Sequence, residues 1–114
     1  MKLYSLLTVL IFVCGCTKNA ATSDSQPMTE VQLATRGQAI YKLNCIACHN
    51  PDPSLDGATG PAIKGSSLEL VTARVTKAQY PEGYKPKRDS KIMPPLPQLE
   101  KEVPALHAFL NSKN

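Results

Sequence analysis

The residues Asn44-Cys45-Ile46-Ala47-Cys48-His49-Asn50, which read NCIACHN, contain half of the four cysteines and one of the two histidines of the 114-residue chain. Cys45, Cys48 and His49 stand at positions i, i+3 and i+4, which share one face of a helix. Two thiols and one imidazole can therefore meet the same flat object. This arrangement is needed to add both thiols across the two vinyl groups of a haem while the imidazole binds the iron, and it is typical of c-type haem attachment.

Other interpretations of this motif require features that the sequence lacks. A thioredoxin-type dithiol follows a β-strand, whereas a helical pattern precedes Cys45 here. A zinc site needs four ligands, and only His107 remains downstream. A plain disulfide has no need of His49. We therefore predict one covalently attached haem c, with a thiol oxidoreductase as the most distant alternative, which a colourless protein would favour.

Length and composition fit a small domain built around a cofactor. The chain has room for one small domain. Such domains bury a small share of their surface and often need a disulfide, a metal or another crosslink for stability. It contains no Trp, four Tyr and two Phe, so a core made of side chains alone is thin. The net charge of +4 is mild, and no nucleic-acid-binding motif accompanies it, so we expect no nucleic-acid partner.

The N-terminus has the pattern of an export signal. Lys2 precedes an apolar run over residues 3–13, which is too short for a membrane span of about 20 residues and predicts a signal peptide. The run ends in VCGC (13–16), which resembles the lipobox of bacterial lipoproteins. The resemblance implies a signal peptide over residues 1–15 and a lipid on the Cys16 sulfur. The alternative is an ordinary secretory peptide, cut a few residues later, and a soluble exported protein.

A polar segment separates this signal from the folded domain. Residues 17–28, TKNAATSDSQPM, are small, polar and without periodicity, which predicts a flexible tether. We assign residues 16–30 to the lipidated Cys16 and the tether, and residues 31–114 to the domain. The expected localisation is the periplasmic side of a bacterial membrane.

Helical periodicity begins at about Thr29. Either Thr29 or Thr35 can cap a first helix that runs into the cysteine motif, with one stripe of residues at spacings of three and four: Leu33, Gly37, Ile40, Tyr41 and Asn44. Ser66 followed by Glu69 is typical of a capping box. This box predicts a second helix with three residues on one side: Leu68, Val71 and Val75.

A last helix is predicted from about Leu99, with four apolar residues at helical spacing: Val103, Leu106, Phe109 and Leu110. Pro104 is compatible with a helix only in its first turn, so this helix starts late, near Lys101, or is kinked. The Pro- and Gly-rich residues 50–65 and the five prolines of residues 79–97 predict long loops. The sequence therefore predicts an all-α fold with three or four helices.

Residues 31–114 resemble the class I cytochromes c of the short bacterial type. Gly37 and Tyr41 stand eight and four residues before Cys45, where this family has a small residue and an aromatic one at the crossing of its first and last helices. LHAFL (106–110) is similar to the terminal helix, with Phe109 at the crossing. The resemblance implies the small cytochrome c fold around one haem.

Two further segments carry the resemblance and imply site residues. GPAIKG (60–65) is similar to the loop after the haem motif, which implies that the Pro61 carbonyl accepts a hydrogen bond from His49 and fixes its tautomer. KIMPPLP (91–97) looks like the segment with the sixth iron ligand, which implies Met93.

Met93 has an ordinary alternative role, because methionine commonly fills gaps in cores. It lies 44 residues after His49 in a proline-flanked loop, which leaves enough chain to cross the haem, so we favour it as a ligand. The rival, His107, lies between Leu106 and Phe109 and is expected to point to solvent.

The resemblance implies an electron carrier and not an enzyme, because His/Met ligation fills both axial positions. We expect a membrane-tethered monohaem cytochrome c that carries single electrons between respiratory or periplasmic redox partners. One alternative is a dedicated haem subunit of one oxidoreductase complex. Another is a haem sensor or peroxidase-like protein in which Met93 does not bind iron.

Basic residues gather before Met93, namely Lys85, Lys87, Arg88 and Lys91. Each alone fits a solvated loop. Together they would form a positive rim that attracts a partner with an acidic docking surface. They could also pair with the haem propionates, for which Arg74, Tyr80, Tyr84 and Arg88 are candidate donors.

Overall fold

The computed structural model describes residues 26–89 and 91–113. The predicted signal peptide, Cys16 and residues 17–25 of the tether lie outside the described residues. Within the described part there is no helix long and apolar enough to cross a membrane.

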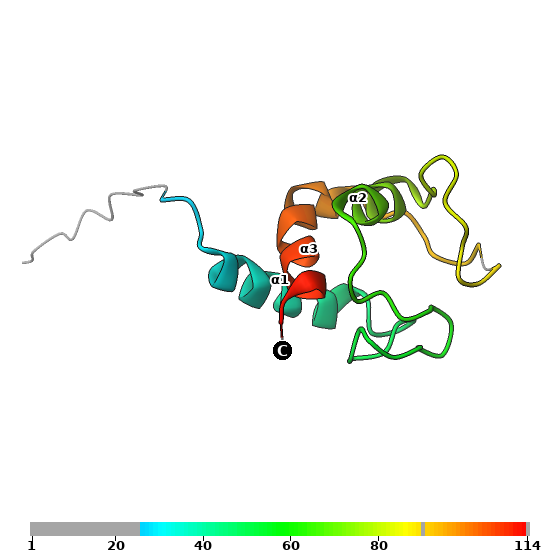
Figure 1. Cartoon of the computed structure of the whole chain (residues 1–114), viewed down its shortest axis with the longest axis horizontal. Helices are drawn as coiled ribbons and strands as arrows, with labels where there is room; N and C mark the ends of the chain where they lie inside the picture. The colour runs from blue at the N-terminus through cyan, green and yellow to red at the C-terminus, as the bar shows by residue number, and fades with distance from the viewer. Residues whose placement is uncertain (1–25, 90, 114) are drawn as a thin grey trace, which may run out of the picture.

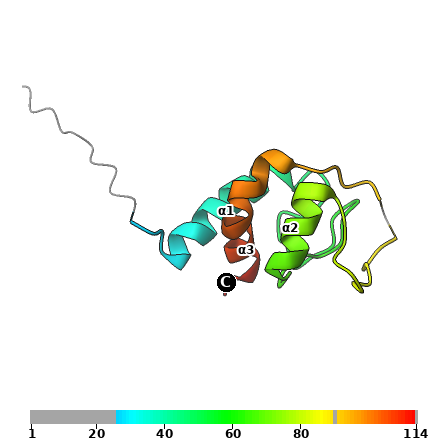
Figure 2. The same cartoon turned by 90° about the horizontal axis from the view of Figure 1, so that it is seen from above.

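The described chain forms three α-helices and one 3-10 helix, in the order α1 (Glu30–Asn44), α2 (Leu68–Lys77), η1 (Pro97–Glu102) and α3 (Val103–Asn111). No strand occurs among the described residues, and the predicted all-α fold is confirmed. α3 packs against both α1 and α2 and lies between them (Figures 1 and 2). The long loops extend from the end of the domain opposite the N-terminal segment, and they form the side on which the site lies.

Helix α1 begins at a capping box. The Thr29 side chain accepts a hydrogen bond from the Gln32 backbone N–H, and the Gln32 side chain accepts one from the Thr29 N–H. Thr29 is therefore the cap, and Thr35 instead donates to the Val31 carbonyl oxygen. Asn44, the last residue of the predicted stripe, is exposed, and its side chain donates to the carbonyl oxygen one turn before it.

Helices α1 and α3 cross at Gly37. A Cβ atom at this position would overlap the Ala105 carbonyl and lie 2.9 Å from Phe109 Cβ. One turn later Tyr41 is fully buried, with its ring centroid 5.3 Å from that of Phe109. The absence of a side chain at Gly37 thus allows the backbones to approach, and the aromatic pair fills the adjoining space.

Helix α2 is capped by Ser67, which accepts a hydrogen bond from Leu70 N. The predicted capping box is therefore wrong by one residue, because the Ser66 hydroxyl donates to the Ile63 carbonyl oxygen in the preceding loop. Val71 and Val75 are buried as expected, but Leu68 is 48% exposed. Leu68 is the first residue of the helix, where the chain has not yet reached the core.

Helix α3 starts late and so accommodates Pro104 without a kink. η1 covers residues 97–102, and α3 begins at Val103, so Pro104 lies in the first turn, where a missing N–H has no cost. The start is two residues after Lys101. The four predicted apolar residues of this helix are all buried, and with Tyr41, Val71 and Val75 they form the core.

Candidate functional site

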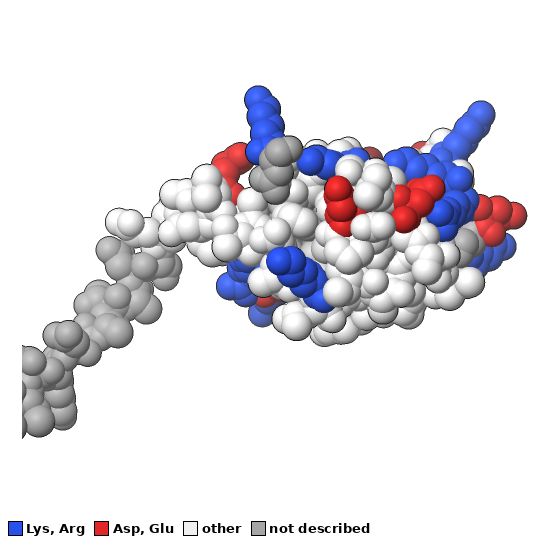
Figure 3. Space-filling view, turned by 90° about the horizontal axis from the view of Figure 1, so that it is seen from below, with Lys and Arg blue, Asp and Glu red and all other residues white. Residues whose placement is uncertain are grey.

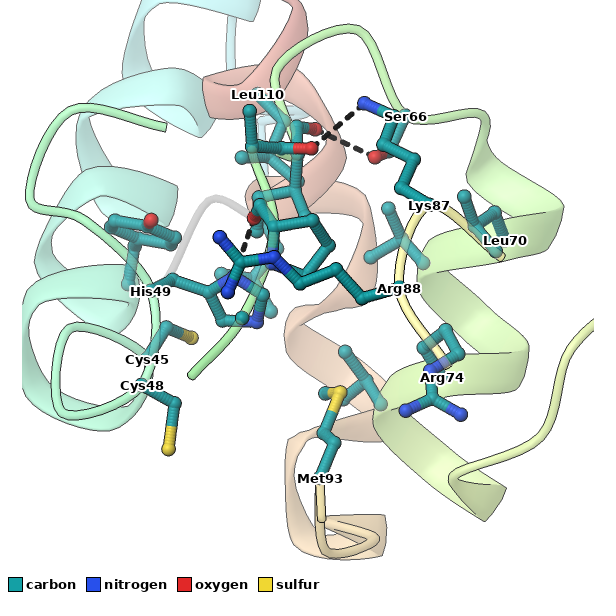
Figure 4. Close-up of a pocket in the computed structure, with 18 of the residues that line it drawn as sticks. Cys45, Cys48, His49, Ser66, Leu70, Arg74, Lys87, Arg88, Met93 and Leu110 are labelled. Atoms are coloured by element: carbon teal, nitrogen blue, oxygen red, sulfur yellow. Dashed lines mark hydrogen bonds between the residues drawn. The ribbon is translucent and has the colours of Figure 1, made fainter. Parts of the chain in front are cut away.

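The cysteine motif forms a single helix-like turn that follows α1. The helix ends at Asn44, and Cys45 caps it by donating its N–H to the Tyr41 carbonyl oxygen at 2.9 Å. The Cys45 carbonyl oxygen then accepts from Cys48 N at 3.2 Å and from His49 N at 2.9 Å. The expectation that the motif lies within the helix is thus wrong. The turn nevertheless keeps both cysteines and His49 at one wall of a pocket (Figure 4).

A backbone carbonyl orients the His49 ring. Its Nδ1 lies 3.0 Å from the Pro61 carbonyl oxygen, which can only accept, so Nδ1 carries the proton. The other ring nitrogen, Nε2, is then left with its lone pair in the neutral imidazole, as a metal ligand requires. The hydrogen bond that the resemblance implied is therefore present in the structure.

Two glycines allow the chain to lie against His49. A Cβ atom at Gly60 would lie 2.6 Å from His49 Nδ1, and one at Gly57 would lie 2.6 Å from His49 Cα. No contact with His49 was predicted for either glycine, although Gly60 opens the GPAIKG segment. A signal was present, since both glycines fall in the loop after the motif, where an isolated Gly often indicates close approach of the backbone.

The proximal loop, residues 50–65, is held by its own backbone. The Cys48 carbonyl oxygen accepts from Thr59 N and Gly60 N at 3.2 and 2.9 Å. The Tyr41 hydroxyl donates to the Asn50 carbonyl oxygen at 2.6 Å. Burial is the main cause that raises the pKa of Tyr41 to about 12, so this hydroxyl keeps its proton at neutral pH. The residues on both sides of His49 are consequently fixed.

The acidity of Cys45 does not match that of a redox dithiol. Burial, assisted by the neighbouring Cys48, raises the pKa of the Cys45 thiol to about 11. Reactive cysteines of disulfide oxidoreductases instead have a lowered pKa, because the thiolate is the nucleophile. This difference counts against the thiol oxidoreductase alternative.

Met93 lies across the pocket from the cysteine turn. It belongs to the distal loop, residues 79–97, is half-buried and packs against the core. Figure 4 shows its sulfur directed into the pocket, with Cys45, Cys48 and His49 on the other side. The rival His107 is half-buried and does not line this pocket.

The lining of the pocket fits a haem in its chemistry. The space enclosed by the lining residues amounts to about 1000 Å³ when the part open to solvent is included. Between the two walls the lining is apolar and comes mainly from α2 and α3: Leu70, Val71, Val75, Leu106 and Leu110. A flat apolar group would have two thiols and an imidazole on one side and a thioether on the other.

Polar side chains line another part of the pocket, and they are partly engaged with the protein. Arg74 lies 4.1 Å above the Tyr80 ring and donates to the Ala78 carbonyl oxygen at 2.6 Å. Tyr80 stacks on Tyr84, with 5.4 Å between the ring centroids. All three line the pocket, so the polar edge of a cofactor could still contact them.

The basic cluster of the distal loop divides into two pairs. Lys87 and Arg88 line the pocket, whereas Lys85 and Lys91 are exposed and do not line it. In the view of Figure 3, acidic side chains lie among the Lys and Arg side chains at the end of the domain away from the N-terminal segment. This face is therefore mixed in charge and not uniformly positive.

Comparison with known proteins gives one match. A family model described as cytochrome c matches residues 34–114, which is most of the chain and includes every residue that lines the pocket. No curated protein and no solved structure matches the chain.

Proposed function

The chain belongs to the cytochrome c family, and from this membership we propose that it is a membrane-tethered monohaem carrier on the exported side of a bacterial membrane. Membership in this family establishes that the protein is a haem-based electron carrier with covalently attached haem c, for which Cys45 and Cys48 have the required spacing. Our proposal adds four points to this: the membrane tether, the iron ligands, the class I type and the redox partners.

The hydrogen bond from His49 to Pro61 carries the assignment of ligands. It fixes the tautomer that leaves Nε2 available for iron, on the wall where both thiols lie. Each thiol would add across one vinyl group, its sulfur to one carbon and its hydrogen to the other, so no oxidant is consumed. Cys45 and Cys48 thus hold the cofactor, and His49 is its proximal ligand.

Met93 is proposed as the sixth ligand because its thioether points into the pocket from the opposite side. A haem with His and Met ligands accepts and returns one electron, and the thioether raises its potential. His49 and Met93 would hold the iron from the two walls of the pocket, and this would leave no place for a substrate to bind it. A donor supplies one electron, and an acceptor removes it.

The position of the tether supports a carrier whose haem end faces outward. The tether enters at the first residue of α1, and the cysteine turn follows the last. A 15-residue helix is about 22 Å long, so the helix separates the start of the domain from the cysteine turn. Exposed Lys85 and Lys91 are then available to a redox partner with an acidic surface.

Visible absorption spectra of protein made in a host that attaches haem c test the proposal. We expect colour that survives acid–acetone extraction and a weak far-red band of sulfur ligation in the oxidised form. Met93→Ala should lose that band and bind CO rapidly when reduced, whereas the matched control Met28→Ala, at the end of the tether, should do neither. Cys16→Ser should release the protein from membranes.

Three results would contradict parts of the proposal. A colourless protein would overturn haem attachment. A coloured wild-type protein that lacks the far-red band and binds CO at once would favour a sensor or peroxidase-like protein. Electron transfer only within a co-purifying complex would favour a dedicated subunit.

A further inference from the structure

The distal loop is joined to the proximal loop through Arg88. Its Nη1 donates to the carbonyl oxygens of Gly57 and Thr59 at 3.3 and 3.1 Å, and its Nη2 lies 3.2 Å from Asp56 Oδ2. Among the described residues, Arg88 and its neighbour Lys87 make every hydrogen bond and ion pair that joins these two loops. The connection therefore depends on a few side chains.

Asp56 connects Arg88 to the backbone beside Pro61, whose carbonyl oxygen accepts the hydrogen bond from His49. Its Oδ1 accepts a hydrogen bond from Ala62 N at 2.7 Å, and Ala62 follows directly on Pro61. Its carbonyl oxygen accepts from Asn50 Nδ2 at 3.3 Å. One carboxylate thus fixes the backbone beside the carbonyl that orients the imidazole and also pairs with the distal loop.

Lys87 adds a second contact at the same place. Its Nζ donates to the Ala62 carbonyl oxygen at 2.8 Å. Ala62 is therefore bound at its N–H by Asp56 of the proximal loop and at its carbonyl by Lys87 of the distal loop. Both loops therefore meet on one residue, which directly follows the His49 acceptor.

Met93 lies between two fixed points of the distal loop. Arg88 is five residues before it, and Leu96 is three residues after it, with Leu96 N donating to the Val75 carbonyl oxygen at 2.6 Å. No hydrogen bond is formed by the described residues between these two points. Five extended residues span up to about 17 Å, so a loop released at Arg88 could carry Met93 out of the pocket.

From this arrangement we infer that Asp56 and Arg88 are positioning residues for Met93, which keep its thioether over the iron by tying the distal loop to the His49 acceptor. The inference rests on the proposed function, because Met93 ligation is part of it. The Arg88 side chain is 34% exposed and the Asp56 side chain is 64% exposed. Because both are in contact with solvent, their ion pair contributes little to global stability. Its effect is local, on the position of the loop.

The test uses the haem-loaded protein and compares Arg88→Gln, Arg88→Lys and Asp56→Asn with wild type. We expect Arg88→Gln to raise the rate of CO binding to the reduced protein by roughly threefold to tenfold, the range for losing one or two hydrogen bonds. Its far-red band should also disappear at a lower urea concentration. Arg88→Lys should be intermediate, because an ammonium keeps the charge but lacks the fork of donors.

Two matched controls change the same charges elsewhere. Asp89→Asn and Lys77→Gln replace exposed side chains that make no hydrogen bond or ion pair with the described residues, and both should behave as wild type. Helix unfolding, followed by circular dichroism, is measured in parallel. Asp56→Asn provides an independent result if Arg88→Gln does not load haem.

The outcomes separate this inference from the proposed function. Wild-type protein without the far-red band would overturn Met93 ligation, and this inference with it. A wild-type band together with Arg88→Gln and Asp56→Asn that match the controls would overturn only the positioning role. A band that is lost in parallel with helix unfolding in the variants would also overturn it, since the pair would then be a general stabiliser.

Discussion

The two loops that enclose the pocket are built differently. In the proximal loop and the cysteine turn, three carbonyl oxygens, those of Cys45, Cys48 and Pro53, each accept two backbone hydrogen bonds. The distal loop makes backbone hydrogen bonds near its ends, from Gln79, Tyr84 and Leu96, among the described residues. The wall with the thiols and the imidazole is therefore set by many backbone hydrogen bonds. The wall with Met93 is set by the side chains of Lys87 and Arg88 and by one backbone hydrogen bond at Leu96.

This difference suggests how one fold can keep its haem while its ligand field varies. Attachment and the proximal ligand depend on a segment that can change only if many bonds break together. The thioether, which influences the potential, lies in the segment with few bonds and thus with low local stability. Substitutions on the proximal side should then affect folding and haem loading, and those on the distal side should affect ligation.

The largest effect is expected at the helix crossing that supports the proximal side. Gly37→Ala places a Cβ atom on the Ala105 carbonyl, and the two backbones must separate. We expect a loss of about 3 kcal/mol or more in the free energy of unfolding, at the upper end of overpacking costs. Urea unfolding of the haem-loaded protein measures it.

Gly83→Ala is the matched substitution in the distal loop. A Cβ atom there meets nothing within 4 Å, but φ is +74°, so only backbone strain of about 1–2 kcal/mol is expected. Equal losses for the two variants would contradict the contrast between the two sides of the pocket.

An effect smaller than that at Gly37 is expected at Gly60. In Gly60→Ala the new Cβ atom would lie 2.6 Å from His49 Nδ1, so the ring or the loop must shift, at a cost of about 1–3 kcal/mol. We expect poorer haem loading and a weaker bond from His49 to iron, seen as high-spin character in the reduced spectrum. Normal spectra with unchanged loading would show that the proximal wall is more adaptable than its hydrogen bonds indicate.

The sequence predicted the parts of this site that depend on local pattern. The spacing of Cys45, Cys48 and His49 identifies the attachment turn because these residues are close in the chain, and the helical stripe identifies the first helix for the same reason. The family resemblance supplied the helix crossing at Gly37 and the contact between His49 and Pro61. The roles of these residues toward the cofactor stay predictions until haem-loaded protein is studied.

Two kinds of contact were not predicted. Ser66 carries the capping-box pattern with Glu69, yet its hydroxyl donates to the Ile63 carbonyl oxygen three residues earlier, and Ser67 caps the helix instead. Arg88 was predicted as a propionate donor, and its contacts with Gly57 and Thr59 span 31 and 29 residues. No local pattern identifies such partners.

The smallest effect is expected at the ion pair that joins α1 to η1, the 3-10 helix that follows the distal loop. Arg36 of α1 forms a bidentate ion pair with Glu102 at the end of η1, and the hydrogen bonds from Arg36 lower the pKa of the Glu102 carboxyl. A carboxyl with a lowered folded-state pKa stabilises the protein above its unfolded pKa, near 4.3, and this contribution is lost as the pH falls through the folded value.

Glu102→Gln should therefore lower stability slightly at pH 7 and match wild type at about pH 2, where the carboxyl is protonated in both states. Exposed Glu100 of the same 3-10 helix provides the control Glu100→Gln. Urea midpoints at several pH values measure both variants, and each is compared with wild type at the same pH because haem ligation also changes in acid. If Glu102→Gln instead weakened the far-red band without lowering the midpoint, the tie would act on Met93, and the distal loop would have a third fixed point.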